Sequence, residues 1–97
     1  MLDKRISEEG LLKLRREYKD EKLVVTNGCF DVIHAGHVQF LSRACMLGDK
    51  FVLGLNGDKS VRALKGPNRP INNVEDRAMV LSGFYFIDYI YVFEEPR

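Results

Sequence analysis

Short apolar runs alternate with helical patterns along this chain, and the alternation limits the folds open to it. Residues 22–26, 51–55 and 87–93 are rich in β-branched, aromatic and other apolar side chains, which is typical of buried strands. Amphipathic patterns over residues 34–47 and 74–82, with a shorter one over 58–64, predict helices between them. This order predicts an α/β domain with a Rossmann-like parallel sheet and flanking helices. Ligands of such sheets bind outside the carboxyl ends of the strands.

Capping residues indicate where the helices begin and end. A further amphipathic helix is expected over residues 7–19, with Ser7 as its N-cap. Asn73 is expected to cap helix 74–82, and Gly48 suits the left-handed residue that often follows a helix. Residues 65–72 contain one glycine and two prolines and are expected to form a loop. The 97 residues allow a single domain, with the N-terminal helix followed by a nucleotide-binding core over residues 22–97.

Charge and cysteine content narrow the class of protein. Fifteen basic and fourteen acidic residues give a net charge of +1, which does not favour a nucleic-acid partner. No apolar run is long enough to span a membrane, and residues 1–5 lack the apolar stretch of a signal peptide. Cys29 and Cys45 have no metal-ligand spacing. A reduced, cytoplasmic protein that binds small molecules is therefore expected.

The loop after the first strand combines a glycine turn with two histidines. Gly28 offers close backbone approach, and the start of the next helix offers unpaired N–H groups to an anion. His34 and His37 are three residues apart, so they share a helix face, and Gly36 leaves space between them. Either histidine alone would more often be structural. Together in this context they predict phosphate binding, and Asp31 beside them would orient a group or position a cation.

The wider pattern resembles a known family. Two elements in this loop are similar to the signature of the HxGH nucleotidyltransferase superfamily, which includes cytidylyltransferases: Gly28-Cys29-Phe30-Asp31 and His34-Ala35-Gly36-His37. Further segments occur in the same order in the heptose 1-phosphate adenylyltransferase domain of ADP-heptose synthase: Thr26-Asn27-Gly28, Leu47-Gly48-Asp49, Asn56-Gly57-Asp58, Leu64-Lys65-Gly66, Arg69-Pro70-Ile71-Asn72 and Glu75-Asp76-Arg77. The resemblance covers residues 23–95.

The resemblance implies a reaction and a role for each matching residue. The reaction is transfer of AMP from ATP to a heptose 1-phosphate with release of pyrophosphate, in lipopolysaccharide core precursor synthesis. Mg²⁺ would bridge the nucleotide phosphates, with no metal ligand from the protein. The implied catalytic residues are His34, His37 and Lys65. Phosphate-binding roles fall to Gly28, Cys29, Phe30, Gly36 and Arg77, and substrate-binding roles to Asp31, Asn56 and Asp58. Without the resemblance, Lys65 would be interpreted as a solvated loop lysine and Arg77 as part of a surface salt bridge.

Several alternatives stay open on the residues alone. A cytidylyltransferase acting on glycerol 3-phosphate or a similar alcohol phosphate would use the same loop, and so would a nucleotide-binding module without catalysis. A homodimer is also compatible with the sequence. Members of the family carry a second phosphate- and base-binding element, with an Ile-Ser-Ser/Thr-Thr stretch, which does not occur before Arg97. We therefore expect a fold incomplete at its C-terminus and no catalysis by these 97 residues alone.

Overall fold

Four parallel strands form one sheet in the computed structural model, which describes residues 3–94. They are β1 (Arg5–Ile6), β2 (Leu23–Gly28), β3 (Lys50–Asn56) and β4 (Tyr89–Phe93), in the spatial order β1-β4-β3-β2. Thr26 of β2 lies opposite Leu53 of β3, which in turn lies opposite Ile90 of β4. The parallel register brings the carboxyl ends of β2, β3 and β4 to the same edge of the sheet. The predicted end of the domain at residue 97 lies outside the described residues.

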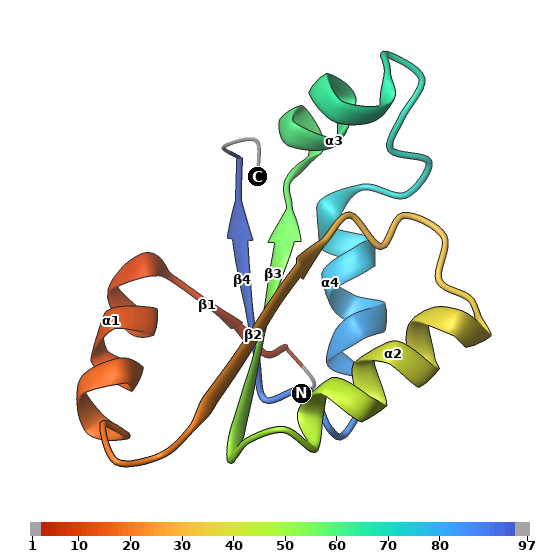
Figure 1. Ribbon diagram of the computed structural model, residues 1–97. Coiled ribbons are helices and arrows are strands. Elements are labelled where there is room, and N and C mark those ends of the chain that lie inside the picture. The colour runs from red at the N-terminus through yellow and green to blue at the C-terminus, as the bar shows by residue number, and fades with distance from the viewer. Residues whose placement is uncertain (1–2, 95–97) are drawn as a thin grey trace.

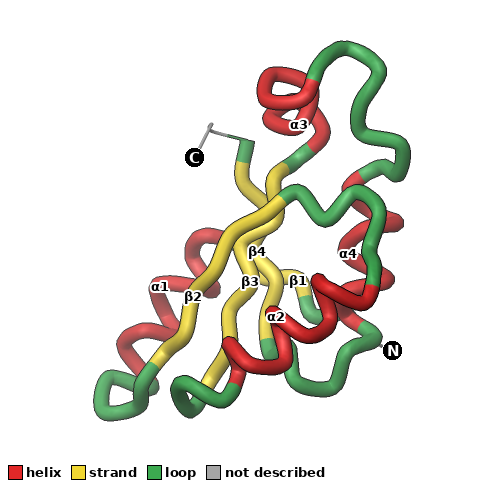
Figure 2. The backbone as a smooth tube through the Cα atoms, turned by 45° about the vertical axis from the view of Figure 1, so that its right-hand side comes forward, coloured by secondary structure: helices red, strands yellow, loops and turns green. Residues whose placement is uncertain are grey.

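Helices cover both faces of the sheet (Figure 1). They are α1 (Glu8–Glu17), α2 (Ala35–Cys45), α3 (Asp58–Lys65) and α4 (Val74–Ser82). α1 runs from edge strand β1 to edge strand β2 on one face, while α2 and α4 lie on the other. α3 and the loop that follows it extend beyond the carboxyl end of β3, as Figure 2 also shows. The Rossmann-like α/β fold predicted from the sequence is confirmed.

Most predicted elements agree with the structure to within two or three residues. Ser7 and Asn73 cap α1 and α4 as predicted, because their side chains accept hydrogen bonds from the Gly10 and Asp76 N–H groups at 3.0 and 2.9 Å. Strand β1 was not predicted, since two residues carry no periodic pattern. The left-handed conformation expected for Gly48 is wrong. Instead, a Cβ on Gly48 would lie 2.7 Å from the Lys22 carbonyl oxygen, so glycine permits a close approach of two backbone segments.

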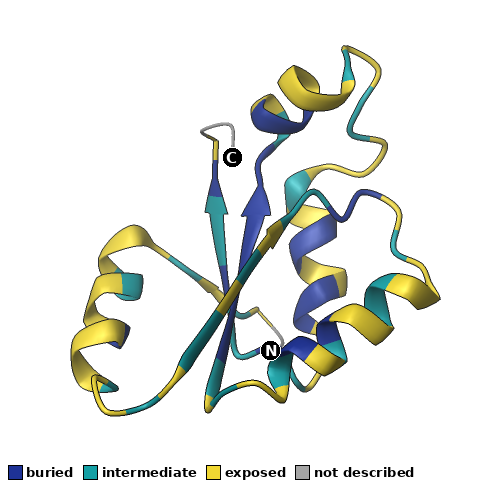
Figure 3. Ribbon diagram, viewed as in Figure 1, coloured by how far each residue is buried: buried dark blue, intermediate teal, exposed yellow. Residues whose placement is uncertain are grey.

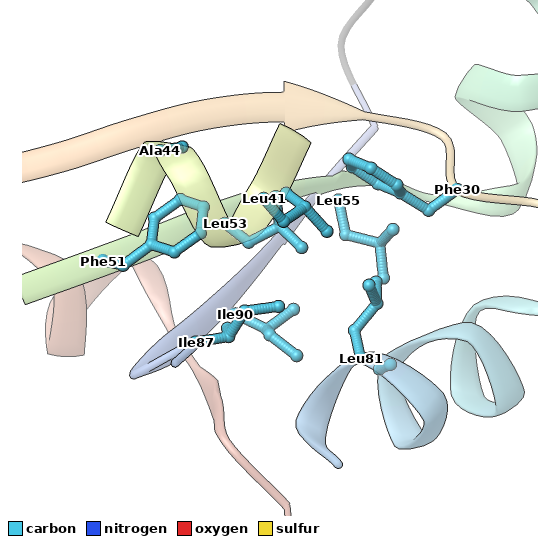
Figure 4. Packing of buried hydrophobic residues seen from close by; sticks show 10 residues of the cluster. Phe30, Leu41, Ala44, Phe51, Leu53, Leu55, Leu81, Ile87 and Ile90 are labelled. Atoms are coloured by element: carbon cyan, nitrogen blue, oxygen red, sulfur yellow. The ribbon is translucent and has the colours of Figure 1, made fainter. Parts of the chain in front are cut away.

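The hydrophobic core lies between the sheet and the helices α2 and α4 (Figure 4). Alternate side chains of β3 meet inward-facing residues of both helices, and the buried cluster consists of Phe30, Leu41, Ala44, Phe51, Leu53, Leu55, Ala78, Leu81, Ile87 and Ile90. Strand β3 is buried along almost its whole length, whereas the outward faces of α1 and α2 are exposed (Figure 3). Since Phe30 belongs both to this core and to the β2–α2 loop, the core fixes that loop in place.

Candidate nucleotide-binding site

Phe30 determines the path of the chain after β2. Its φ of 48° is in the left-handed region, which a bulky side chain seldom adopts, and its ring is 7% exposed. The ring lies over Gly28, where an added Cβ would overlap it. Gly28 itself is the last residue of β2 and has no positive φ. The glycine is needed to accommodate the Phe30 ring, and the backbone strain is at Phe30, a type of strain that concentrates at functional sites.

The two histidines form a stacked pair at the start of α2. His34 is the N-cap, and its Nδ1 accepts a hydrogen bond from the Gly36 N–H at 3.1 Å. Nδ1 of His37 accepts from the His34 N–H at 3.2 Å, and the two ring centroids are 4.0 Å apart. A Cβ on Gly36 would lie 2.9 Å from the His34 ring, so this glycine makes room for His34 rather than for a ligand. The His37 ring also meets the edge of Phe30, with centroids 5.4 Å apart.

These hydrogen bonds fix the tautomer of both imidazoles. A neutral ring whose Nδ1 accepts a hydrogen bond carries its proton on Nε2. Burial of the ring and the charge that His34 can carry both lower the pKa of His37. His37 is therefore neutral at pH 7 and presents an Nε2–H donor, which can stabilise phosphate oxygens without adding charge.

A pocket of about 360 Å³ opens beside His37, outside the carboxyl end of β2. Its lining comes from the end of β2, the β2–α2 loop, α2, the end of α3 and the loop after it: Asn27, Gly28, Cys29, Phe30, Asp31, Val32, His37, Phe40, Lys65 and Arg69. Six predicted site residues are in this group. His34, Gly36, Asn56, Asp58 and Arg77 are not. Lys65 and Arg69 are the two cationic side chains in the lining.

Asp31 anchors the loop that follows α3. Its carboxylate accepts hydrogen bonds from Arg69 Nε at 2.7 Å and from the backbone N–H groups of Ile71 and Asn72 at 2.8–2.9 Å. The side chain is 2% exposed. Burial alone would raise the pKa of Asp31, but the two backbone N–H groups and Arg69 outweigh it and lower the pKa to about 2. Asp31 is thus ionised and fully engaged within the protein.

Arg77 joins three segments behind the pocket. The guanidinium donates to the carbonyl oxygens of Asn72 at 2.9 Å, Cys29 at 2.8 Å and Asn56 at 2.7 Å. It also forms an ion pair of 2.7 Å with Asp58. We call this group the Arg77 hub. The alternative interpretation of Arg77 as part of a surface salt bridge is wrong, since the side chain is 1% exposed. Asn56 is buried as well, and its side chain donates to Ser60 Oγ at 2.8 Å.

Sequence reasoning assigned no role to four lining residues: Asn27, Val32, Phe40 and Arg69. Asn27 and Arg69 belong to matched segments, so the resemblance contained a signal for them, whereas nothing in the pattern distinguished Phe40. Over residues 3–94, no group of three or more His, Cys, Asp or Glu side chains could hold a metal ion. Cys29 and Cys45 are both free. No helix among the described residues is long and apolar enough to cross a membrane.

The fold and the pocket define a class of protein. A parallel α/β sheet with a glycine- and histidine-bearing loop at the carboxyl end of an early strand is a nucleotide-binding arrangement. Residues 25–96 match the family model described as cytidylyltransferase-like. The chain belongs to the cytidylyltransferase-like family of nucleotidyltransferases, and the family predicted from the HxGH loop is confirmed.

Relatives and a solved structure agree with this assignment. The chain is 51% identical over 92 residues to the "Bifunctional protein HldE" of Wolinella succinogenes, which is 93% of this chain and 19% of that protein. It is 54% identical over 87 residues to the protein of that name from Campylobacter concisus, with 90% and 18% coverage. The chain thus spans about a fifth of the length of these curated relatives.

A crystal structure described as the lipopolysaccharide core biosynthesis protein from Thermoplasma volcanium GSS1 has a similar fold. The TM-score is 0.70 at 26% sequence identity. The match covers 76% of this chain and 59% of that one.

Proposed function

We propose that this chain supplies the phosphate-binding wall of an adenylyltransferase site that transfers AMP from ATP to a heptose 1-phosphate. One observation carries the proposal: His37, held by the His34 N–H, lines the same pocket as the backbone of Gly28 and Cys29 and the cation of Lys65. Neutral donors beside an exposed lysine suit a polyphosphate whose charge moves during reaction. The choice of ATP and heptose 1-phosphate as substrates is based on the segments that match the heptose 1-phosphate branch in the same order.

The reaction needs no covalent intermediate and no general base. An oxygen of the sugar phosphate, already an anion, attacks the α-phosphorus of ATP. One P–O bond forms as the bond to the β-phosphate oxygen breaks, and pyrophosphate leaves with the electron pair. Charge then accumulates on the α-phosphoryl oxygens and the leaving group, where preorganised donors such as His37 Nε2–H are most effective. Mg²⁺, when bound, neutralises phosphate charge, and its ligands would be phosphate oxygens and water.

Lys65 and the histidines have distinct parts in this proposal. Lys65 ends α3 with an exposed side chain on the pocket rim, so it can follow the phosphates as they move. His37 is fixed by its Nδ1 hydrogen bond and marks where the charge develops. His34 is exposed at the helix N-cap, stacks on His37 and orients it through its N–H.

We keep the reduced, cytoplasmic location expected from the sequence as part of the proposal.

A matrix of substrates tests the function. Pyrophosphate release is measured with ATP or CTP against heptose 1-phosphate or glycerol 3-phosphate, both on this chain and on the longest natural protein that carries it. We expect release with ATP and heptose 1-phosphate in the longer protein. Release with CTP and glycerol 3-phosphate would favour the cytidylyltransferase alternative. Nucleotide binding with no release in any arm would favour a non-catalytic module.

The edge position of β2 leads us to expect that these residues form only part of an active site. Within residues 3–94, only β3 pairs with β2, and the pocket lies outside the carboxyl end of that edge strand. A ligand crevice in a doubly wound sheet takes its second wall from strands beyond the switch point. We therefore expect no turnover from the 97 residues alone, and measurable ADP-heptose formation by them would contradict this part of the proposal.

A further inference from the structure

We propose that Arg69 binds a phosphate group of the substrate, and that Asp31 is the positioning residue that orients it. This inference rests on the proposed function, because it needs a ligand that carries phosphate. It moves the phosphate-binding role from Arg77, which the sequence suggested, to an arginine with no role assigned by its pattern. It also gives Asp31 a task other than direct contact with the sugar.

Arg77 is committed mainly to contacts within the protein. Its guanidinium makes four hydrogen bonds within the hub and is 1% exposed. One N–H donor remains, and Arg77 borders a second pocket of about 270 Å³ but is absent from the lining of the pocket beside His37. Arg77 therefore holds together the segments that lie behind the pocket.

Arg69 is in the opposite situation. It lines the pocket, and its side chain is 36% exposed. Only Nε is used, in the 2.7 Å bond to Asp31, and no partner for the two terminal nitrogens is found among residues 3–94. A guanidinium is planar and presents its donors as a fixed fork, so holding Nε fixes the plane in which the terminal N–H groups lie. Such a fork matches the oxygens of a phosphate.

Asp31 provides this hold because all of its own contacts are internal. Oδ1 accepts from the N–H groups of Ile71 and Asn72 at 2.9 and 2.8 Å, and Oδ2 accepts from Arg69 and Ile71. The Asn72 side chain donates back to the Asp31 carbonyl at 2.7 Å. The loop and the arginine are thus tied to the same carboxylate, two residues after Cys29. Since two backbone N–H groups share the carboxylate charge, Arg69 is not fully neutralised by its partner.

Calorimetric titration of the longest natural protein that carries this sequence, with ATP, with heptose 1-phosphate and with adenosine, tests this inference. Arg69→Gln should weaken binding of one of the two phosphate ligands by about tenfold to a hundredfold, as expected for loss of charge-assisted hydrogen bonds. The arm that responds identifies which substrate supplies the phosphate. Adenosine binding should be unchanged. Arg69→Lys should recover only part of the affinity, since an ammonium keeps the charge but loses the fork.

The positioning role of Asp31 is tested with a second set of variants. Asp31→Asn should weaken the same ligand, and the double variant should bind no more weakly than Arg69→Gln alone, because Asp31 acts through Arg69. Arg16→Gln is the matched control, an exposed arginine on α1 across the sheet from the pocket. Circular dichroism and melting curves establish that each variant is folded.

The titration results distinguish a failure of the Arg69 inference from a failure of the proposed function. If the unaltered longer protein binds neither phosphate ligand, the proposed function and this inference both fail. If it binds them and Arg69→Gln binds equally well, only the inference fails. Full rescue by Arg69→Lys, or additive losses in the double variant, would overturn the orienting role of Asp31.

Discussion

Replacing Arg77 with methionine removes the Arg77 hub while keeping a side chain of similar length. Three backbone carbonyl oxygens then lose their donors, and Asp58 loses its ion-pair partner. Methionine is a good helix former, so α4 itself is little affected. The free energy of unfolding therefore reports the lost contacts of the guanidinium.

The expected loss in the free energy of unfolding depends on how deeply the partners of Arg77 are buried. A buried acceptor left without a partner costs about 1–3 kcal/mol, and breaking a buried ion pair by removing one side costs about 3–5 kcal/mol. The Asp58 side chain is 29% exposed, so water can solvate its charge and that part of the cost is small. The three carbonyl groups remain, and at about 1–3 kcal/mol each they would cost about 3–9 kcal/mol. The bonds to Asn72 and Cys29 are only part-buried, so we expect the lower part of that range, about 3–5 kcal/mol. In a domain of this size that lowers Tm by more than about 10 °C.

Urea unfolding followed by circular dichroism measures this loss, with the m-value checked for two-state behaviour. Arg62→Met is the matched control, because Arg62 is an exposed arginine in the last turn of α3 and should change stability by less than about 0.5 kcal/mol. A loss below about 1 kcal/mol for Arg77→Met would refute the structural role. It would support the surface position that the sequence suggested.

Four further predictions concern the pocket and its loop. Lys65→Ala should weaken substrate binding or turnover with a stability change under about 0.5 kcal/mol, as thermal melting and kinetics would reveal, and a large fall in Tm with normal activity would contradict it. Because the pKa of Asp31 is lowered to about 2 from 3.8, this group contributes about 2 kcal/mol of stability above pH 4 that is lost as the pH falls toward 2; acid unfolding curves of Asp31→Asn should lack that dependence. Gly28→Ala should cost about 1–3 kcal/mol, because the new Cβ overlaps the Phe30 ring, and unchanged urea unfolding would show that the ring can move aside. Since the pKa of His37 is lowered, turnover should not fall between pH 8 and 6.5 and should decline only at lower pH, where a protonated Nδ1 can no longer accept from His34; a decline centred at or above pH 6.5 would count against a neutral donor.

Local signals in the sequence were sufficient for most of the helices and strands and for the loop that lines the pocket. Helix α4 lies over the predicted residues because the Asn73 cap and an apolar stripe are both local features. The pocket loop was found because its glycine and histidines are adjacent in sequence. The pairing of β1 with β4 joins residues more than eighty positions apart, and no local pattern in a two-residue strand indicates it.

Residue roles that depend on tertiary contacts could not be predicted. Arg77 and Arg69 are both polar residues near turns, yet one is buried among three carbonyl groups and the other lines the pocket. Whether each arginine is buried or lines the pocket depends on where the carboxyl ends of β2 and β3 lie in the fold. Likewise, the sequence suggested Gly28 for close approach of a ligand, whereas in the structure it accommodates the ring of Phe30, whose positive φ no propensity favours.

The effect of His37→Ala on turnover, compared with its effect on ATP affinity, tests the central claim most directly. The measurement is made on the longest natural protein that carries this sequence, with kcat from pyrophosphate release and Kd from titration. If the Nε2–H donor acts on charge that develops during reaction, kcat should fall by about 10²–10³, while Kd for ATP should change by less than about tenfold. A fall in kcat below about tenfold, or an equal loss in ATP affinity, would contradict the transition-state role of this histidine.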